Sequence, residues 1–193
     1  MDAAERMEFP HNMDEVQTQT LSDEAFERVY TQYGKRVYGY FWCKTGNAHT
    51  AEDLTADLFL KVIREYGRFD AAKAPFEVWL FRLARNLAVD HHRVQGRKTA
   101  RTVELDEARD VAAGGTPELR VIQNERDAAV RAAILQLPEK QRHIVSLKYA
   151  AGMKNAEIAA IAGLTESNAG VVLHRALEKL RKTMIKQGVD FHE

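Results

Sequence analysis

The last third of the chain carries a pattern typical of two short amphipathic helices joined at a glycine. Residues 155–181 read NAEIAAIAGLTESNAGVVLHRALEKLR, with Gly163 at the turn and Thr165 at a position where a helix N-cap is favoured. The second helix then starts with the polar residues Glu166, Ser167 and Asn168. Such a helix fits the major groove of duplex DNA, where base edges require hydrogen-bonding groups. The spacing predicts a helix-turn-helix, although a helical hairpin inside a bundle would show the same periodicity.

The distribution of charge favours the DNA-binding interpretation. The whole chain is neutral, with 28 basic and 28 acidic residues, but residues 138–187 hold nine lysines and arginines against four acids. A second basic strip lies in residues 75–101, with six basic residues against two acids. Positive charge is therefore concentrated at two places, as contacts with a phosphate backbone require.

The composition excludes several other classes of protein. A single cysteine, Cys43, excludes an intramolecular disulfide framework and a thiolate zinc cluster. The adjacent His91 and His92 point to different sides of a helix, so no metal site is expected. We find no glycine-rich phosphate loop, HExxH or GxSxG motif, so we expect no enzyme, no catalytic residues and no cofactor. Without a cleavable signal or an 18-residue apolar run, we expect a cytoplasmic protein that is not inserted in a membrane.

The remaining pattern predicts an all-α fold of two small helical domains joined by a flexible linker. Residues 1–22 form an acidic tail, and residues 23–96 form the first domain, with helices from Asp23, from about Thr50 to Tyr66, and from Pro75. Residues 97–118 are polar and contain Gly114, Gly115 and Pro117, which favours a linker. Residues 119–187 form the second domain, with a helix that begins at Pro138, and residues 188–193 form a short tail.

Several motifs, in their order and spacing, resemble the RNA polymerase sigma factors of the sigma-70 family, in the extracytoplasmic-function (ECF) subfamily. AEDLTADLFLKV (51–62), RFD (68–70) and WLFRLARNLAVDHHR (79–93) resemble region 2 of that family. LPEKQRHIVSLKY (137–149) and LHRALEKLR (173–181) resemble region 4. The resemblance implies a protein that binds core RNA polymerase, recognises promoter DNA and helps to melt it, under the control of an anti-sigma factor. It implies a place in the bacterial cytosol, associated with the nucleoid when active.

The resemblance also implies three sets of contact residues. The core-polymerase-binding residues would be Asp53, Asp57, Leu58, Phe59 and Lys61. The residues for recognition and melting of the minus-10 element would be Arg68, Phe69, Asp70, Arg82, Arg85, Asn86, Asp90, His92 and Arg93, with residues 68–76 as the pocket for a flipped base. The minus-35 residues would be Thr165, Glu166, Ser167, Asn168, His174, Arg175 and Lys179. Trp79 is expected to belong to the core rather than to stack on a base.

Two further hypotheses remain open from the sequence. The chain could be a helix-turn-helix repressor or activator that never binds polymerase, and tight duplex binding by the isolated protein would favour that alternative. Independently, the seven acids of residues 1–24 could compete with DNA for the basic strips and so reduce binding by the free protein. A tail without a role is the alternative to that second hypothesis.

Overall fold

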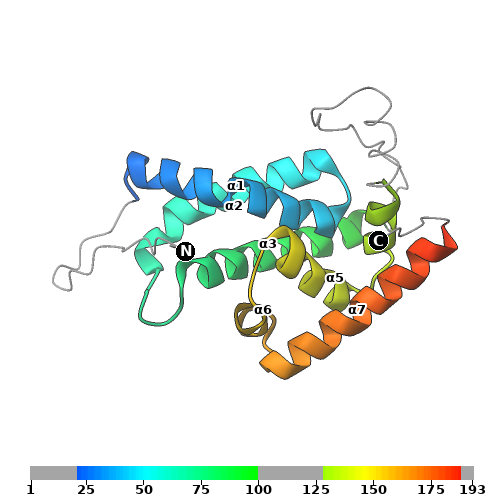
Figure 1. Cartoon of the computed structure of the whole chain (residues 1–193). Coiled ribbons are helices and arrows are strands. Elements are labelled where there is room, and N and C mark those ends of the chain that lie inside the picture. The colour runs from blue at the N-terminus through cyan, green and yellow to red at the C-terminus, as the bar shows by residue number, and fades with distance from the viewer. Residues whose placement is uncertain (1–20, 100–127, 188–193) are drawn as a thin grey trace, which may run out of the picture.

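The computed structural model (Figure 1) describes residues 21–99 and 128–187, and every regular element in those ranges is a helix. The first range contains α1 (Asp23–Thr45), α2 (Ala48–Glu65), the 3-10 turn η1 (Tyr66–Arg68) and α3 (Phe76–Thr99). The second contains a helical segment at 128–135, then α5 (Glu139–Val145), the π-helical turn η2 (Ser146–Ala150), α6 (Asn155–Ala162) and α7 (Glu166–Lys186). The predicted all-α class is confirmed. Most of the acidic tail, most of the predicted linker and residues 188–193 lie outside the described residues.

Helix boundaries in the first domain are set by short polar side chains and by one glycine. The side chain of Ser22 accepts a hydrogen bond from the Ala25 backbone N–H at 3.3 Å, which caps α1. Gly46 ends α1 with a φ of 70°, a conformation that residues with a Cβ rarely adopt. Asn47 then caps α2 by accepting from the Thr50 N–H at 2.8 Å. These caps turn the chain sharply, so α1 and α2 lie side by side in antiparallel directions.

The helix predicted to begin at Pro138 is shorter than its sequence pattern indicates. After the seven residues of α5 the backbone widens into η2, where the Ala151 N–H donates to the Ser146 carbonyl at 3.0 Å. Single π-helical turns of this kind are uncommon and often occur at functional positions. Ala151 follows this turn as its C-cap, and its carbonyl oxygen accepts a hydrogen bond from the first domain.

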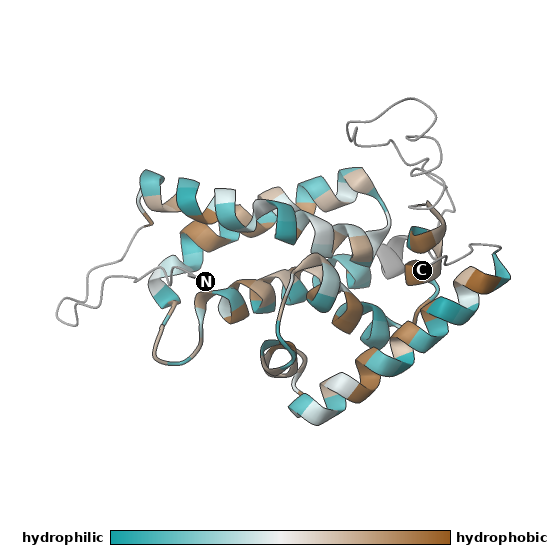
Figure 2. Cartoon of the chain, in the orientation of Figure 1, coloured by the Kyte–Doolittle hydropathy of each residue, from teal (hydrophilic) through white to brown (hydrophobic). Residues whose placement is uncertain are grey.

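The two domains pack against each other and share one hydrophobic core. In Figure 1, α3 lies between the α1–α2 pair above it and the helices of the second domain below it. The buried residues of this shared core include Val37, Leu58 and Phe81 from the first domain and Ile144, Leu147 and Ile158 from the second. Figure 2 shows hydrophilic residues along the outer side of α1, and alternating hydrophobic and hydrophilic bands along α7. Sequence periodicity indicates which residues require burial, but it did not indicate that one domain would cover the other.

Polar contacts join the same two domains. Arg36 of α1 donates from Nε and Nη2 to the Ala151 carbonyl at 2.7 and 2.5 Å, while its Nη1 donates to Glu77 Oε1 at 2.7 Å. Close to this contact, a Cβ built on Gly39 would lie 3.3 Å from the Cβ of Ala150, so α1 and η2 approach closely there. Lys44 of α1 forms an ion pair with Glu139 of α5. The interface therefore combines apolar packing with hydrogen bonds that span both domains.

Candidate functional site

The outer face of α2 carries three of the five residues predicted to bind core polymerase. Asp53 and Asp57 are exposed and Lys61 is half-buried, with its Nζ 3.7 Å from Glu65 Oε1. Leu58 and Phe59 are only 0% and 3% exposed. The side chains of those two residues therefore belong to the core in this conformation, and a partner resting on α2 would touch the charged residues instead.

A groove of about 870 Å³ lies between α1 and α2, beside those charged residues. Its lining is mostly apolar and includes Phe26, Tyr30, Tyr38, Ala56, Phe59, Leu60 and Ile63. Tyr30, Leu60 and Ile63 are 51%, 50% and 41% exposed, which is unusual for large apolar side chains gathered at one place. Sequence analysis missed this groove. The sequence did contain an indication of it, because the apolar residues Leu60 and Ile63 fall outside the helical face that carries Leu54, Leu58 and Val62.

Aromatic side chains gather where η1 and the following loop meet the start of α3. The ring of Phe69 lies 5.4 Å from those of Phe76 and Trp79, and the ring of Tyr66 lies 6.2 Å from that of Phe69. Phe76 is buried, whereas Tyr66, Phe69 and Trp79 are partly exposed and pack against the core. The loop before α3 is thus bordered by aromatic rings, which are the side chains on which an unstacked base can stack.

A short local turn fixes Asp70 in this loop. Its Oδ1 accepts from the Ala72 N–H at 3.0 Å and its Oδ2 lies 3.0 Å from Lys73 Nζ. The hydrogen bond from Lys73, followed by that from Ala72, lowers the pKa of the Asp70 carboxyl. Asp70 is therefore a carboxylate that shapes the loop, while its neighbour Arg68 is exposed.

The predicted minus-10 residues on α3 fall into two groups. Arg85, Asn86, Asp90, His92 and Arg93 are exposed along the helix. Arg82 is also exposed, but its Nη2 donates to the carbonyl of Ala160 in the last turn of α6, at 3.0 Å. Of the predicted residues on α3, Arg82 is thus the one whose guanidinium hydrogen-bonds to the second domain.

The helix-turn-helix has the boundaries that its sequence predicts. Gly163 takes a φ of 69° between α6 and α7, and the Thr165 hydroxyl caps α7 by accepting from the Asn168 N–H at 3.2 Å. All seven predicted minus-35 residues are exposed: Thr165, Glu166, Ser167, Asn168, His174, Arg175 and Lys179. Ala169 and Ala176 on the opposite side of α7 are buried. The polar face of α7 is therefore available to a large partner.

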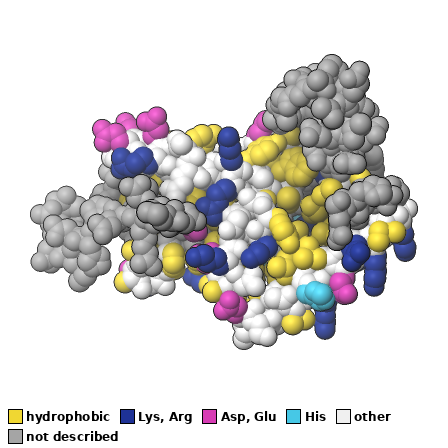
Figure 3. Space-filling view, in the orientation of Figure 1, with side chains coloured by type: hydrophobic (Ala, Val, Ile, Leu, Met, Phe, Trp, Pro, Cys, Tyr) yellow, Lys and Arg dark blue, Asp and Glu magenta, His cyan; other side chains and the backbone are white. Residues whose placement is uncertain are grey.

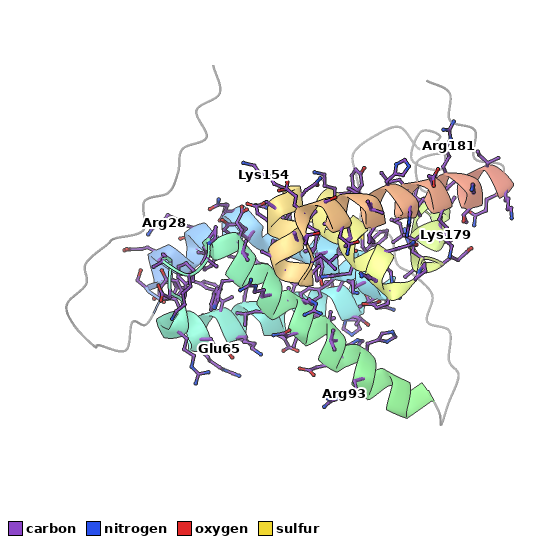
Figure 4. The ribbon with its side chains drawn as sticks, turned by 90° about the horizontal axis from the view of Figure 1, so that it is seen from below. Arg28, Glu65, Arg93, Lys154, Lys179 and Arg181 are labelled. Atoms are coloured by element: carbon purple, nitrogen blue, oxygen red, sulfur yellow. The ribbon has the colours of Figure 1, made fainter. Side chains whose placement is uncertain are left out.

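The described parts of the two basic strips lie on separate surfaces. Figure 3 shows lysine and arginine side chains at the outer edge of the molecule over the C-terminal part of α7. In Figure 4, Arg93 projects from the C-terminal half of α3 on one side of the view, and Arg181 projects from α7 on the other. Two separate surfaces can hold two stretches of nucleic acid, or one long stretch that passes from one to the other.

Other kinds of site find no support among the described residues. No group of three or more histidine, cysteine, aspartate or glutamate side chains within 21–99 and 128–187 is placed to hold a metal ion. None of the described helices combines the length and the apolar character needed to cross a lipid bilayer.

Comparison with known proteins identifies both halves of the chain. The family described as Sigma-70 region 2 matches residues 29–98, and that described as Sigma-70, region 4 matches residues 127–180. The ECF RNA polymerase sigma factor SigF of Caulobacter vibrioides is 33% identical over 162 residues, which cover 83% of this chain and 86% of SigF. The ECF RNA polymerase sigma factor BldN of Streptomyces coelicolor is also 33% identical over 162 residues, which cover 83% of this chain but only 61% of BldN.

A solved structure has the same fold. The sigma factor RpoE of Bartonella quintana, crystallised in complex with the anti-sigma factor NepR, superposes with a TM-score of 0.68 and 21% identity. The match covers 83% of this chain and 97% of that one.

Proposed function

The chain belongs to the sigma-70 family of RNA polymerase sigma factors, in the ECF subfamily, and from that membership we propose that it binds core RNA polymerase and directs it to promoters. One observation carries the proposal: region 2 and region 4 follow each other on one chain, and each presents an exposed polar surface on a folded helical scaffold. A sigma factor is a transcription initiation factor, not an enzyme. It acts on DNA, which for this chain implies the bacterial cytosol and the nucleoid.

For core polymerase, we propose the surface formed by α2 and the adjacent groove. Asp53, Asp57 and Lys61 supply charge, while Leu60 and Ile63 supply exposed apolar area beside them. Interfaces of this kind gain most of their affinity from a desolvated apolar centre and gain specificity from a polar rim. A helical element of the polymerase lying in the groove would touch both kinds of side chain.

For the melted minus-10 strand, we propose the loop 68–76 and the exposed side of α3. Opening the duplex costs a few kcal/mol per base step, and stacking on an aromatic ring returns about 1–3 kcal/mol per base. Phe69 and Trp79 are partly exposed rings at the loop, and Trp79 thereby becomes a candidate contact as well as a core residue. Arg85 and Arg93 would hold the phosphates of the separated strand.

For the minus-35 element, we propose the N-terminal turns of α7. Glu166, Ser167 and Asn168 lie in its first turn, where the narrow helix end enters a major groove. His174, Arg175 and Lys179 follow along the same helix and would bind phosphates. An anti-sigma factor is the expected regulator, because the structural relative RpoE was crystallised in complex with one.

Transcription with purified components tests the proposal. Core RNA polymerase without a sigma factor is mixed with this chain and a library of promoter fragments, and run-off transcripts are sequenced. We expect initiation at a small set of fragments that share two short upstream elements, and no such transcripts without the chain. A chain that binds duplex DNA tightly by itself, but neither binds core polymerase nor yields directed transcripts, would be a repressor or activator instead.

A further inference from the structure

A buried tyrosine and histidine meet at the interface between the two domains. The hydroxyl of Tyr40 in α1 lies 3.1 Å from Nδ1 of His143 in α5, and the two residues are 103 positions apart in sequence. Tyr40 is 0% exposed and His143 is 8% exposed, and their rings meet edge to face at a centroid distance of 5.9 Å. Each domain therefore contributes one member of the pair, and separating the domains would expose both.

The pair satisfies only one nitrogen of the imidazole. Nε2 of His143 is buried and has no hydrogen-bond partner among the described residues. Burial raises the pKa of Tyr40 above its ordinary value, so the hydroxyl stays protonated and can donate to a neutral Nδ1. Adding a proton at Nδ1 would end the hydrogen bond that Tyr40 donates there, and would place a positive charge on a buried ring whose Nε2–H has no acceptor among the described residues.

The neighbouring charges also oppose protonation of His143. Lys44 of α1 and Arg85 of α3 bring positive potential from the first domain. Glu139 of α5 is the negative group nearby, but it already binds Lys44 and Arg142, and these contacts lower its pKa although burial alone would raise it. The pKa of His143 is lowered to about 3 while the domains are packed together, mainly by burial and to a smaller extent by the charges of Lys44 and Arg85.

We propose that Tyr40 and His143 form an acid-sensitive contact, which holds the two domains together while the imidazole is neutral and releases them when it takes up a proton. Release would also break the hydrogen bond from Arg82 to Ala160 and remove α6 from α3. Of the minus-10 residues that the sequence predicts on α3, Arg82 would then be released from its contact with α6. The contact thus makes the availability of Arg82 depend on pH.

The direction and size of the effect follow from linkage. In the separated state His143 is exposed to water and its pKa returns to the ordinary value of 6.5. A group whose pKa is depressed in the packed state stabilises that state above pH 6.5, and the stabilisation is lost as pH falls towards 3. The ratio of separated to packed molecules should therefore rise about tenfold between pH 7.5 and pH 5.5. Ordinary carboxylates change little in that window, which isolates the effect of histidine.

Single-molecule energy transfer on the full chain measures this ratio. Dyes are attached at Glu52→Cys on α2 and Lys182→Cys on α7, with Cys43→Ala as background, and the two populations are counted at pH 7.5 and 5.5. In the parent chain we expect the tenfold rise. In His143→Phe, and in His143→Gln as a second neutral replacement, we expect a ratio that does not depend on pH. His174→Gln, which changes an exposed histidine on α7, should keep the full dependence.

Three results would overturn the proposal. The first is a parent chain whose ratio is the same at both pH values. The second is a pH dependence that persists in both His143 variants, and the third is a chain that shows no packed population at pH 7.5. These outcomes are independent of the proposed function, because run-off transcription at pH 7.5 can succeed or fail whatever the pH dependence of packing.

Discussion

Substituting Leu58 by alanine should cost stability, because this residue lies within the core rather than on the surface that we propose for polymerase. Leu58 is 0% exposed and packs in the main hydrophobic cluster. Removing its buried carbons loses their transfer free energy and leaves a cavity, and such changes cost about 2–5 kcal/mol. The close-packed surroundings of α1 and α3 restrict relaxation, so we expect at least about 3 kcal/mol. Urea unfolding followed by circular dichroism measures the change in the free energy of unfolding.

The matched control for that experiment is Asp57→Ala, at the preceding residue of the same helix. Asp57 is exposed, so its removal should leave the unfolding midpoint nearly unchanged while it weakens binding to core polymerase. Affinity is measured with labelled chain titrated by core enzyme. The reasoning would be refuted if Leu58→Ala unfolded at the parent urea concentration, or if a stably folded Leu58→Ala chain lost more core affinity than Asp57→Ala.

Three further substitutions test individual elements. Gly46→Ala should destabilise the chain by more than about 1 kcal/mol in a thermal melt, because φ is 70° and the new Cβ would lie 2.5 Å from Leu135 Cδ1. The control, Gly34→Ala in the middle of α1, should be neutral or stabilising in the same measurement. Thr165→Ala should cost about 1 kcal/mol through loss of the α7 cap, and an unchanged melting temperature would contradict that role. Arg175→Ala should lower the slope of log affinity against log salt for promoter DNA by about 0.9, and an unaltered slope would remove it from the phosphate contacts.

Local features of this fold were predictable because they depend on neighbouring residues. The cap at Ser22, the left-handed Gly46 and Gly163, and the cap at Thr165 each follow from side-chain chemistry within four residues. Family membership was predictable from motif order, and the comparisons confirm it.

Contacts between distant residues could not be predicted in the same way. Arg36 meets a carbonyl oxygen 115 residues away, and nothing in its local sequence indicates that partner. The π-helical turn after Val145 was missed for the same reason, since it packs against α1, which is far away in the sequence. The resemblance implied that Leu58 contacts polymerase, whereas in the structure its side chain is buried in the core.

Permanganate footprinting at a promoter tests most directly whether the first domain binds the opened strand while the second domain binds paired DNA. The reagent modifies thymines that have left the duplex stack. With core polymerase and this chain, we expect reactive thymines in one short segment near the start site, fewer of them with Arg85→Ala, and unchanged upstream protection in that variant. Bound polymerase with no reactive thymines, or upstream protection that disappears with Arg85→Ala while melting persists, would contradict the account.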